Sequence, residues 1–424
     1  MNIKDYRPRI IDAQIKARLA STGGILLTGP KWCGKTTTGL FHAKSSVYMD
    51  LPENRERYQL APSLVLNGAF PRLIDEWQDM PSIWDRVRRR IDEESRSGLY
   101  ILTGSAVPAD TPSHTGTGRF ARLKMRSMTL FESGDSSGSV SLGDLFDGKP
   151  VEPAASDLNY EKAVWLICRG GWPSTLRLSD RRAATDAARD YINALTASDI
   201  SRVDGVARDP QKVRLLLQSL ARTVAAPANI SMLRADISAH TQDADVSERS
   251  VHSYLNALRQ IFVLEEQPAW ASPQTLRSKT RIRTTPKRHF TDPSLAAAAL
   301  FATPDKLARD PETAGLLFES LCIRDLDVYA GALQGGVYHY RADNGLEIDA
   351  IVQLDDGRWG AVEVKMGSHR FEEAAASLIK FARKMAECPS MPPPRFLMIL
   401  CATGGAAATR ADGVHIVPLD CLKP

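Results

Sequence analysis

The sequence predicts an α/β protein with a parallel sheet in its N-terminal part. Between residue 9 and about residue 150, short apolar runs of strand length alternate with helix-like runs, the pattern of strands joined by crossover helices. Polar residues follow several of these apolar runs, and the ends of parallel strands share one edge of the sheet, where ligands bind. The chain of 424 residues is longer than one hydrophobic core supports, so we expect several domains.

The expected elements of the first domain alternate regularly. The strands are GGILLTG (23–29), VYMDL (47–51), RLIDE (72–76) and LYILTG (99–104), with helices from residue 9, from residue 35 and over 82–95. A segment rich in Ser, Gly and Asp over 132–157 then indicates a loop at the first domain boundary.

The rest of the chain divides by its changing pattern. Residues 160–225 are helical in pattern, whereas 228–290 contain three helix-like runs and the apolar strand FVLEEQPAW. From about residue 310 the expected order is helix, three strands, helix and strand, which is a further α/β unit. We therefore predict domains over 1–150, 151–225, 226–290 and 291–424, of which the second is a helical linker or lid.

The composition excludes several classes of protein. With 43% hydrophobic and 25% charged residues the chain matches a folded globular protein rather than a disordered or membrane-embedded one. The net charge of +4 permits nucleic-acid contact without requiring it. The six cysteines contain no CxxC pair, and the N-terminus lacks an apolar targeting core. We expect reduced thiols, a cytoplasmic protein and no membrane partner.

The segment GPKWCGKT, residues 29–36, fits the pattern G-x-x-x-x-G-K-[ST] between an apolar strand and a helix. Its glycines let backbone N–H groups surround phosphates, and the following helix directs its positive end at them. Lys35 is expected to reach the β and γ phosphate oxygens, and the Thr36 hydroxyl to bind Mg²⁺. The sequence thus predicts a P-loop for ATP or a related triphosphate, lined by Gly29, Pro30, Lys31, Trp32, Cys33, Gly34, Lys35, Thr36 and Thr37.

The run RLIDE supplies the acids that such a site needs. Asp75 ends an apolar strand, where its carboxylate can hold the magnesium ion through its water shell, and Glu76 can polarise the attacking water. The alternative is an ordinary solvated strand end. The next strand ends in LTGS, so Thr103 and Ser105 are candidates for groups beside the γ-phosphate, with a capping role as the alternative.

The stretch GTGRFAR contains Arg119 and Arg122, which are candidates for stabilising transition-state charge in a neighbouring subunit. For either residue alone, an ordinary surface arginine is the competing interpretation.

Five segments together resemble a known family: GPKWCGKTTT, LIDEWQ, YILTGSA, GRFARLKMRSMTLFESG and RGGWPSTL. They are similar to bacterial and archaeal AAA-type ATPases with a conserved C-terminal domain of unknown function, over nearly the whole chain. The resemblance implies a P-loop ATPase at 1–150, a winged helix at 226–290 and a fold similar to PD-(D/E)xK nucleases at 291–424. Trp32 and Cys33 depart from the usual loop, but both side chains can point away from the phosphates.

The segment from ISMLRADISAH to VSERSVHSYLNALRQIFVLEE has the pattern of a helix-turn-helix. Ser247 is the expected N-cap, with Arg249, His252 and Tyr254 on the exposed face. A basic ribbon follows that would suit a wing on DNA phosphates, with Arg277, Lys279, Arg281, Arg283, Lys287 and Arg288. The alternative is a winged helix between domains whose basic face meets protein or water.

The last domain carries a candidate metal site. Asp349 ends a strand, and Glu363 and Lys365, two apart on the next strand, face the same side. Two carboxylates and a lysine suit metal-assisted hydrolysis of a phosphodiester. Glu319, on the preceding helix, matches an acidic residue that the resemblance implies. The alternative is a cross-strand ion pair in an inactive nuclease-like fold.

The leading hypothesis is a cytosolic Mg²⁺-dependent ATPase, a hydrolase, coupled to a DNA-engaging C-terminal half with a candidate nuclease site. The runner-up is an ATP-gated regulatory or binding module with an inactive nuclease-like domain. A third hypothesis, a structural homo-oligomer with vestigial nucleotide binding, is opposed by intact Lys35, Thr36, Asp75 and Glu76.

Overall fold

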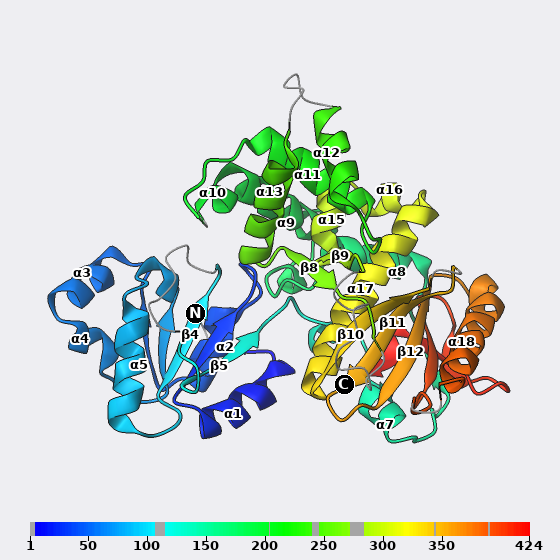
Figure 1. Ribbon diagram of the computed structural model, residues 1–424, viewed down its shortest axis with the longest axis horizontal. Helices are drawn as coiled ribbons and strands as arrows, with labels where there is room; N and C mark the ends of the chain where they lie inside the picture. Colours follow the sequence, from blue (N-terminus) through cyan, green and yellow to red (C-terminus); the bar gives the residue numbers. More distant parts are fainter. Residues whose placement is uncertain are drawn as a thin grey trace. The chain divides into compact units, whose positions relative to one another are not determined.

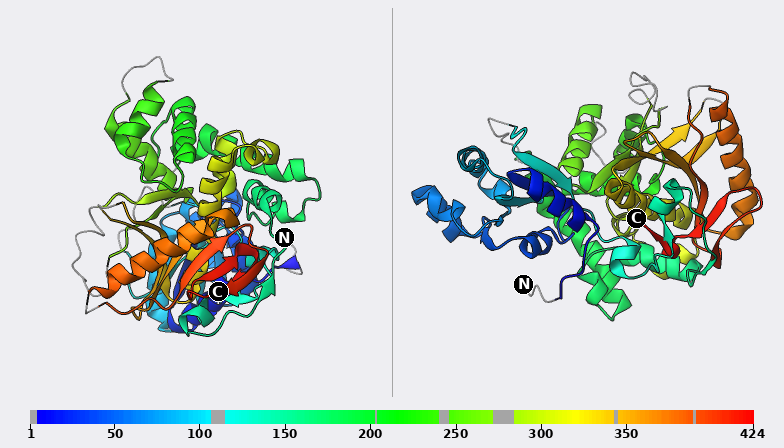
Figure 2. Two further views of the ribbon diagram at one scale, coloured as in Figure 1. Left: turned by 90° about the vertical axis from the view of Figure 1, so that its right-hand side faces the viewer. Right: turned by 90° about the horizontal axis from the view of Figure 1, so that it is seen from below.

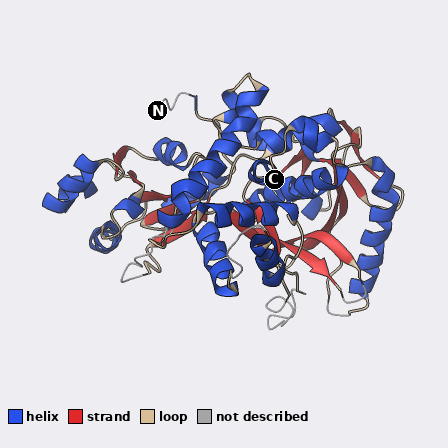
Figure 3. Ribbon diagram, turned by 90° about the horizontal axis from the view of Figure 1, so that it is seen from above, coloured by secondary structure: helices blue, strands red, loops and turns tan. Residues whose placement is uncertain are grey.

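The computed structural model describes residues 5–106, 115–202, 204–239, 246–271, 284–342, 345–388 and 391–424 (Figure 1). The chain forms two compact units. Unit 1 contains Met1–Ser127, Ala197–Arg208 and Leu255–Val263, and unit 2 contains Met128–Thr196, Asp209–Tyr254 and Leu264–Pro424. Figure 3 shows that helices flank the strands of each unit.

Unit 1 is built on a five-stranded parallel sheet with strand order β2-β3-β4-β1-β5. This confirms the predicted parallel sheet, although the strand β5 was not expected. The strands are β1 (Gly24–Thr28), β2 (Ser45–Tyr48), β3 (Arg72–Asp75), β4 (Tyr100–Gly104) and β5 (Phe120–Lys124). The helices are α1 (Ile11–Ser21), α2 (Lys35–His42), α3 (Pro52–Leu60), α4 (Pro62–Leu66), η2 (Trp77–Asp79), α5 (Ile83–Glu94) and α10 (Ile200–Arg202).

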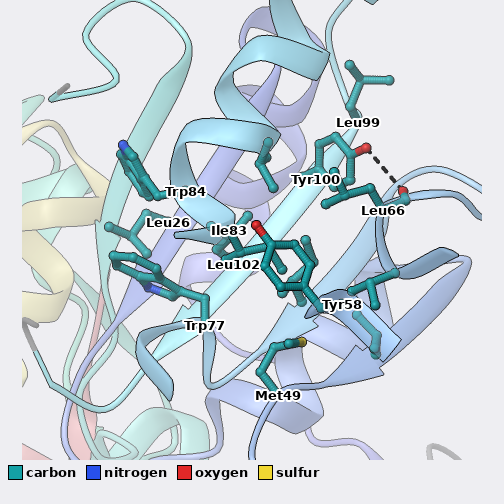
Figure 4. Close-up of a cluster of buried hydrophobic side chains, with 14 of the residues drawn as sticks. Leu26, Met49, Tyr58, Leu66, Trp77, Ile83, Trp84, Leu99, Tyr100 and Leu102 are labelled. Atoms are coloured by element: carbon teal, nitrogen blue, oxygen red, sulfur yellow. Dashed lines mark hydrogen bonds between the residues drawn. The ribbon is translucent and has the colours of Figure 1, made fainter. Parts of the chain in front are cut away.

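One core of unit 1 lies between this sheet and α5 (Figure 4). Helix α5 buries residues three and four apart, namely Ile83, Trp84, Val87 and Ile91, which is the spacing of one helical face. Trp84 packs on Trp77, which follows β3, with ring centroids 5.1 Å apart. The Tyr100 hydroxyl donates to the Leu66 carbonyl oxygen at 3.1 Å. These contacts fix the strand ends that carry the polar residues.

Unit 2 contains a seven-stranded mixed sheet with strand order β10-β11-β12-β13-β15-β14-β7. The central strands β12, β13 and β15 are parallel, and the outer pairs are antiparallel. The strands are β7 (Ala154–Ala155), β10 (Gly335–Arg341), β11 (Glu347–Leu354), β12 (Trp359–Lys365), β13 (Leu397–Cys401), β14 (Ala406–Thr409) and β15 (His415–Pro418). Two further pairs are β6 (Val140–Ser141) with β16 (Leu422–Lys423), and β8 (Leu264–Gln267) with β9 (Lys287–Phe290).

Two long helices pack against this sheet. Helix α17 contacts β10, β11 and β12, and α18 contacts β11, β12 and β13 (Figure 2). Their bounds are α17 (Pro311–Ala332) and α18 (Phe371–Ala386). The other helices in the described residues are α6 (Leu130–Ser133), α7 (Leu142–Phe146), α8 (Tyr160–Arg169), η3 (Thr175–Arg177), α9 (Arg181–Ala194), η4 (Leu195–Asp199), α11 (Pro210–Arg222), α12 (Ile230–Ser238), α13 (Glu248–Gln260), α15 (Pro293–Ala299), α16 (Pro304–Ala308), η5 (Ser368–Arg370) and η6 (Leu419–Cys421).

A fully buried ionic network holds unit 2 together. The Arg324 guanidinium contacts Asp325 at 2.7 Å and Asp292 at 3.0 Å. Asp325 also accepts from the Leu130 backbone N–H, and Asp292 from that of Gly171, each at 2.9 Å. Paired charges with satisfied hydrogen bonds are the form in which a protein interior tolerates ions. The segments MTLFE and RGGW therefore have a structural role here.

In the part of the chain that the structure describes, no helix is both long and apolar enough to cross a membrane.

Candidate nucleotide site and C-terminal charged cluster

The loop over residues 29–36 connects β1 to α2. Gly29 has φ 153° and Gly34 has φ 99°, conformations that a side chain would strain. A Cβ atom on Gly29 would also lie 2.1 Å from the Met125 carbonyl oxygen. Cys33 is buried under the loop, while Trp32 is 52% exposed. Cys33 thus points into the protein, and Trp32 extends into solvent.

Lys35 begins α2 and is buried, with only 5% of its surface exposed. Its Nζ donates to the carbonyl oxygens of Gly29 at 3.0 Å and Pro30 at 2.8 Å. The ammonium group is therefore held at the start of the loop by two neutral carbonyl groups. An anion entering the loop would find a nearby positive charge that no described carboxylate contacts at hydrogen-bond distance.

Asp75 ends β3 at the same edge of the sheet as the loop. The Thr36 hydroxyl donates to its carboxylate at 2.9 Å, and Thr103 at the end of β4 donates to it as well. Burial raises the pKa of Asp75, and the two hydroxyls only partly offset this effect. A buried carboxylate surrounded by hydroxyl groups is suited to a hard cation. Mg²⁺ commonly takes one or two carboxylates together with phosphate oxygens, so these residues fit it.

Glu76 follows Asp75 with a left-handed backbone, at φ 49°. Its carboxylate accepts from the Ser105 hydroxyl at 3.0 Å and from the Gln78 side-chain amide. These bonds fix the carboxylate without a salt bridge, which leaves it able to accept a proton from water. The predicted residues of the P-loop and the two acids thus converge at one edge of the sheet.

The sequence interpretation missed two residues of this site. Gln78 donates a hydrogen bond to Glu76, and Arg9 donates one to the backbone of the loop at Cys33. The buried Arg9 guanidinium donates to the carbonyl oxygens of Cys33 and Arg126, each at 2.9 Å. Arg9 precedes the first helix in a polar segment, and no short motif marks it. Only its contact partners, 24 and 117 residues away, reveal its position.

The other candidates of unit 1 have contacts of their own. Lys31 forms an ion pair with Asp199 at 2.7 Å. Arg119 pairs with Asp92 at 2.9 Å, and Arg122 lies over the Trp84 ring. Both arginines are therefore engaged within their own unit, as ordinary surface arginines are.

In unit 2 the structure brings the predicted acids together. Lys365 Nζ lies 2.6 Å from Glu363 and 3.4 Å from Asp349, whose carboxylate also accepts from the Val364 N–H at 2.8 Å. Glu319, on α17, reaches the same place. Lys287, which the sequence predicts in a DNA-binding ribbon, lies among these acids. We call Lys287, Glu319, Glu347, Asp349, Glu363 and Lys365 the charged cluster.

The prediction of an exposed basic ribbon is wrong for Lys287 and Arg288. Both lie buried in β9. Lys287 Nζ contacts Glu319 at 2.9 Å, Glu347 at 3.1 Å and Asp349 at 3.7 Å. Arg288 donates to the Ala228 carbonyl oxygen and lies 3.5 Å from Glu266. Neither side chain is available to DNA phosphates. The other four residues, Arg277, Lys279, Arg281 and Arg283, lie outside the described residues.

The charges of the cluster shift one another. Burial and Asp349 raise the pKa of Glu319 to about 7 and that of Glu363 to about 8. Burial also disfavours the charge of Asp349, yet Lys365 and Lys287 hold its pKa below the ordinary value. Glu319, Asp349 and Glu347 raise the pKa of Lys287 although burial opposes its charge. The ammonium groups are thus the cations that keep Asp349 ionised.

The cluster does not fit a divalent ion as its residues are placed. Over the described ranges, no three Asp, Glu, His or Cys side chains converge on a point that could hold one metal ion. In this cluster each of Glu319, Asp349 and Glu363 has a lysine ammonium within 4 Å.

The predicted helix-turn-helix falls on α12 and α13. The Ser247 hydroxyl accepts from the Ser250 N–H at 3.1 Å, close to the start of α13. Arg249 and His252 are exposed, and Tyr254 is half-buried.

Comparison with known protein families supports a P-loop domain in unit 1. Residues 21–133 match the family described as AAA domain, and this part of the chain is therefore an AAA-type P-loop ATPase domain. Residues 314–422 match a domain of unknown function, DUF4143, and residues 161–306 match another, DUF8612. The chain thus combines an AAA domain with a C-terminal DUF4143 domain.

Two whole proteins with similar sequences are described as uncharacterized. Uncharacterized proteins of Mycobacterium bovis and Mycobacterium tuberculosis are each 24% identical over 364 residues, which cover 84% of this chain and 73% of theirs. Among solved structures, a Walker-type ATPase of Pyrococcus abyssi is 14% identical over 70% of this chain and 96% of its own, with a TM-score of 0.40. A RuvB variant of Thermotoga maritima is 14% identical over 61% and 89%, with a TM-score of 0.29. Both scores are low.

Proposed function

We propose that unit 1 binds ATP with Mg²⁺ and hydrolyses it to ADP and phosphate. One observation carries this proposal: Lys35, Thr36, Asp75 and Glu76 meet at the same edge of the parallel sheet, with the Thr36 hydroxyl 2.9 Å from Asp75. Residues 29–37 would surround the phosphates with backbone N–H groups, and Lys35 would leave its two carbonyl partners for the phosphate oxygens.

The roles of the acids follow from their neighbours. Bound magnesium would neutralise charge on the β and γ phosphates. Thr36 and Asp75 would hold the ion, and Thr103 keeps the Asp75 carboxylate in place. Glu76, oriented by Ser105 and Gln78, would take the proton of the attacking water. The water oxygen would bond to the γ-phosphorus while the bond from the γ-phosphorus to the β–γ bridging oxygen breaks, and the electron pair of that bond would stay on ADP.

Phosphate release by purified full-length protein tests this proposal. Lys35→Ala is expected to abolish triphosphate binding, whereas Glu76→Gln is expected to bind ATP normally and lose turnover. Glu56→Gln, an exposed glutamate on α3, is the matched control. Equal turnover by wild type and Glu76→Gln would contradict the assignment of the base.

We propose in addition that unit 2 binds a partner under the control of the nucleotide, rather than cutting DNA. The observation that favours this second function is the contact of Lys287 with three carboxylates. The alternative is a nuclease in which Glu319, Asp349 and Glu363 bind a metal ion and Lys365 assists catalysis. Incubation with Mn²⁺ and single- or double-stranded DNA separates the two, since cleavage that Asp349→Ala abolishes would favour the nuclease.

DNA is the candidate partner. Helices α12 and α13 followed by the antiparallel pair β8–β9 support a winged helix over 226–290, between a linker at 151–225 and a nuclease-like fold at 291–424. Arg249 and His252 on α13 would face the DNA. Binding should weaken steeply with salt and on replacing Arg249, or Arg281 and Arg283, with Ala. A salt-independent affinity would remove DNA from the proposal. Self-association and a cytoplasmic location stay predictions of the sequence.

A further inference from the structure

Lys287 is placed at the centre of the charged cluster by elements from three parts of unit 2. Its strand, β9, brings the side chain to Glu319 on α17 and to Glu347 and Asp349 on β11. The residue is only 2% exposed. Its ammonium group therefore lies among carboxylates from helix α17 and from strand β11 of the seven-stranded sheet.

The contacts of Lys287 are those of a bound cation. Its Nζ lies 2.9 Å from Glu319, 3.1 Å from Glu347 and 3.7 Å from Asp349. A magnesium ion bound by these three acids would need shorter ligand distances of ~2.0–2.1 Å, so the acids would have to close in on the place that the ammonium group occupies. The ammonium and a divalent ion would also repel strongly at that separation. Both cannot be present together.

The second oxygen of Asp349 and one oxygen of Glu363 also have partners. Asp349 accepts from the Val364 N–H at 2.8 Å and faces Lys365 at 3.4 Å, while Lys365 also binds Glu363 at 2.6 Å. The two lysines thus approach the acids from two strands, β9 and β12.

We infer that Lys287 is the resident cation of the charged cluster, and that its ammonium group excludes divalent metal ions from the acids of unit 2. The cluster is then a metal-independent ionic site, and once this one ammonium is removed the side chains of Glu319, Glu347 and Asp349 can move closer together and bind Mn²⁺. This inference concerns unit 2 alone and does not depend on ATP hydrolysis by unit 1.

Thermal unfolding of nucleotide-free, full-length protein in EDTA and in millimolar Mn²⁺ tests the inference. The wild type is expected to show the same Tm in both. Lys287→Met is expected to unfold at a lower temperature in EDTA and to gain roughly 3 °C or more with Mn²⁺. Lys380→Met, an exposed lysine on α18, should behave as the wild type does. No gain for a folded Lys287→Met would overturn the inference.

Two measurements keep the test decisive if Lys287→Met does not fold. The double variant Lys287→Met/Glu319→Gln removes one charge of each sign, so it should fold better in EDTA than the single variant. Wild-type protein and Asp349→Asn should bind equal amounts of Mn²⁺ without nucleotide. A Mn²⁺ ion that the wild type binds and Asp349→Asn loses would contradict the exclusion of metal, whatever the other variants do.

Discussion

Asp75 in unit 1 is a buried carboxylate on a strand and Asp349 in unit 2 is a partly buried one, and their neighbours differ. Asp75 accepts hydrogen bonds from the hydroxyl groups of Thr36 and Thr103, and burial raises its pKa. Asp349 lies within 4 Å of two ammonium groups, and Lys365 and Lys287 hold its pKa below the ordinary value despite burial.

These neighbours imply that the acid site of unit 1 needs a cation from solution, whereas the acid site of unit 2 contains its own cations, the two lysines. In unit 1 Lys35 is held by backbone carbonyls, and its charge together with the two hydroxyl groups offsets the burial of Asp75 only in part. In unit 2 the lysines already compensate the acids. Buried carboxylates alone therefore do not indicate a metal site; the groups that neutralise them decide.

The largest effect is expected at Glu76. Glu76→Gln should lower the turnover of ATP by about 10²–10⁴-fold, because the amide cannot accept the proton of water. Binding of ATP should change little, since the loop and Lys35 are untouched. Single-turnover phosphate release, with nucleotide affinity measured separately, checks both parts. A parallel loss of affinity would instead assign Glu76 to nucleotide binding.

The two lysines offer a direct contrast in stability. Lys287→Met should destabilise unit 2 by about 3 kcal/mol, because it leaves the partly buried Glu319 and Asp349 without this partner. Lys35→Met should cost about 1 kcal/mol or less, since its partners are neutral carbonyls in a loop. Hydrogen exchange of β11 and α2 peptides reports the local effect of each change. Similar costs for the two would remove the distinction between the sites.

The pH dependence of stability should come from unit 2. The pKa of Glu363 is raised from 4.5 to about 8, so the folded state keeps a proton that the unfolded state has lost. The free energy of unfolding should therefore fall as pH rises toward 8, by on the order of 1 kcal/mol between pH ~6.5 and ~8. Below pH 6.5 the buried His289 and His339 act in the opposite direction, because burial lowers their pKa values from 6.5 to about 3 and about 4.

Glu363→Gln should flatten this fall, and the exposed Glu387→Gln should leave it unchanged. Urea unfolding at several pH values measures the slope. An unchanged slope in Glu363→Gln would mean that Glu363 is ionised in the folded protein.

The smallest effect is expected at Arg9, a positioning residue for the loop. Arg9→Lys can keep one of the two carbonyl contacts but not both. The KM for ATP should rise about tenfold with little change in kcat, because one charge-assisted hydrogen bond is lost. The exposed Arg7→Lys is the control. A fall in kcat at constant KM would place the effect of Arg9 on the chemical step instead.

The nucleotide site could be predicted because its residues are close in sequence to the strands that carry them. The apolar run ending at Thr28 fixes the loop, and the run ending at Asp75 fixes both acids. Arg9 and Gln78 were missed, since their roles arise from contacts that no local pattern encodes.

The charged cluster shows where prediction from sequence fails. The alternation within each strand correctly brought Asp349, Glu363 and Lys365 together. Lys287 was assigned to an exposed ribbon because its neighbours in the sequence are basic. Lys287 pairs with residues 32, 60 and 62 positions away, and these contacts depend on how α17, β11 and β9 pack in the tertiary fold. The acids that the sequence predicts as metal ligands therefore bind an ammonium group instead.

Counting bound Mn²⁺ tests the comparison most directly. Electron paramagnetic resonance of free Mn²⁺, with full-length protein and a non-hydrolysable ATP analogue, should report one bound ion per chain. This ion should be lost in Thr36→Val and retained in Asp349→Asn. A second ion that Asp349→Asn removes, or a single ion that survives Thr36→Val, would contradict the claim that unit 1 recruits its cation while unit 2 contains its own.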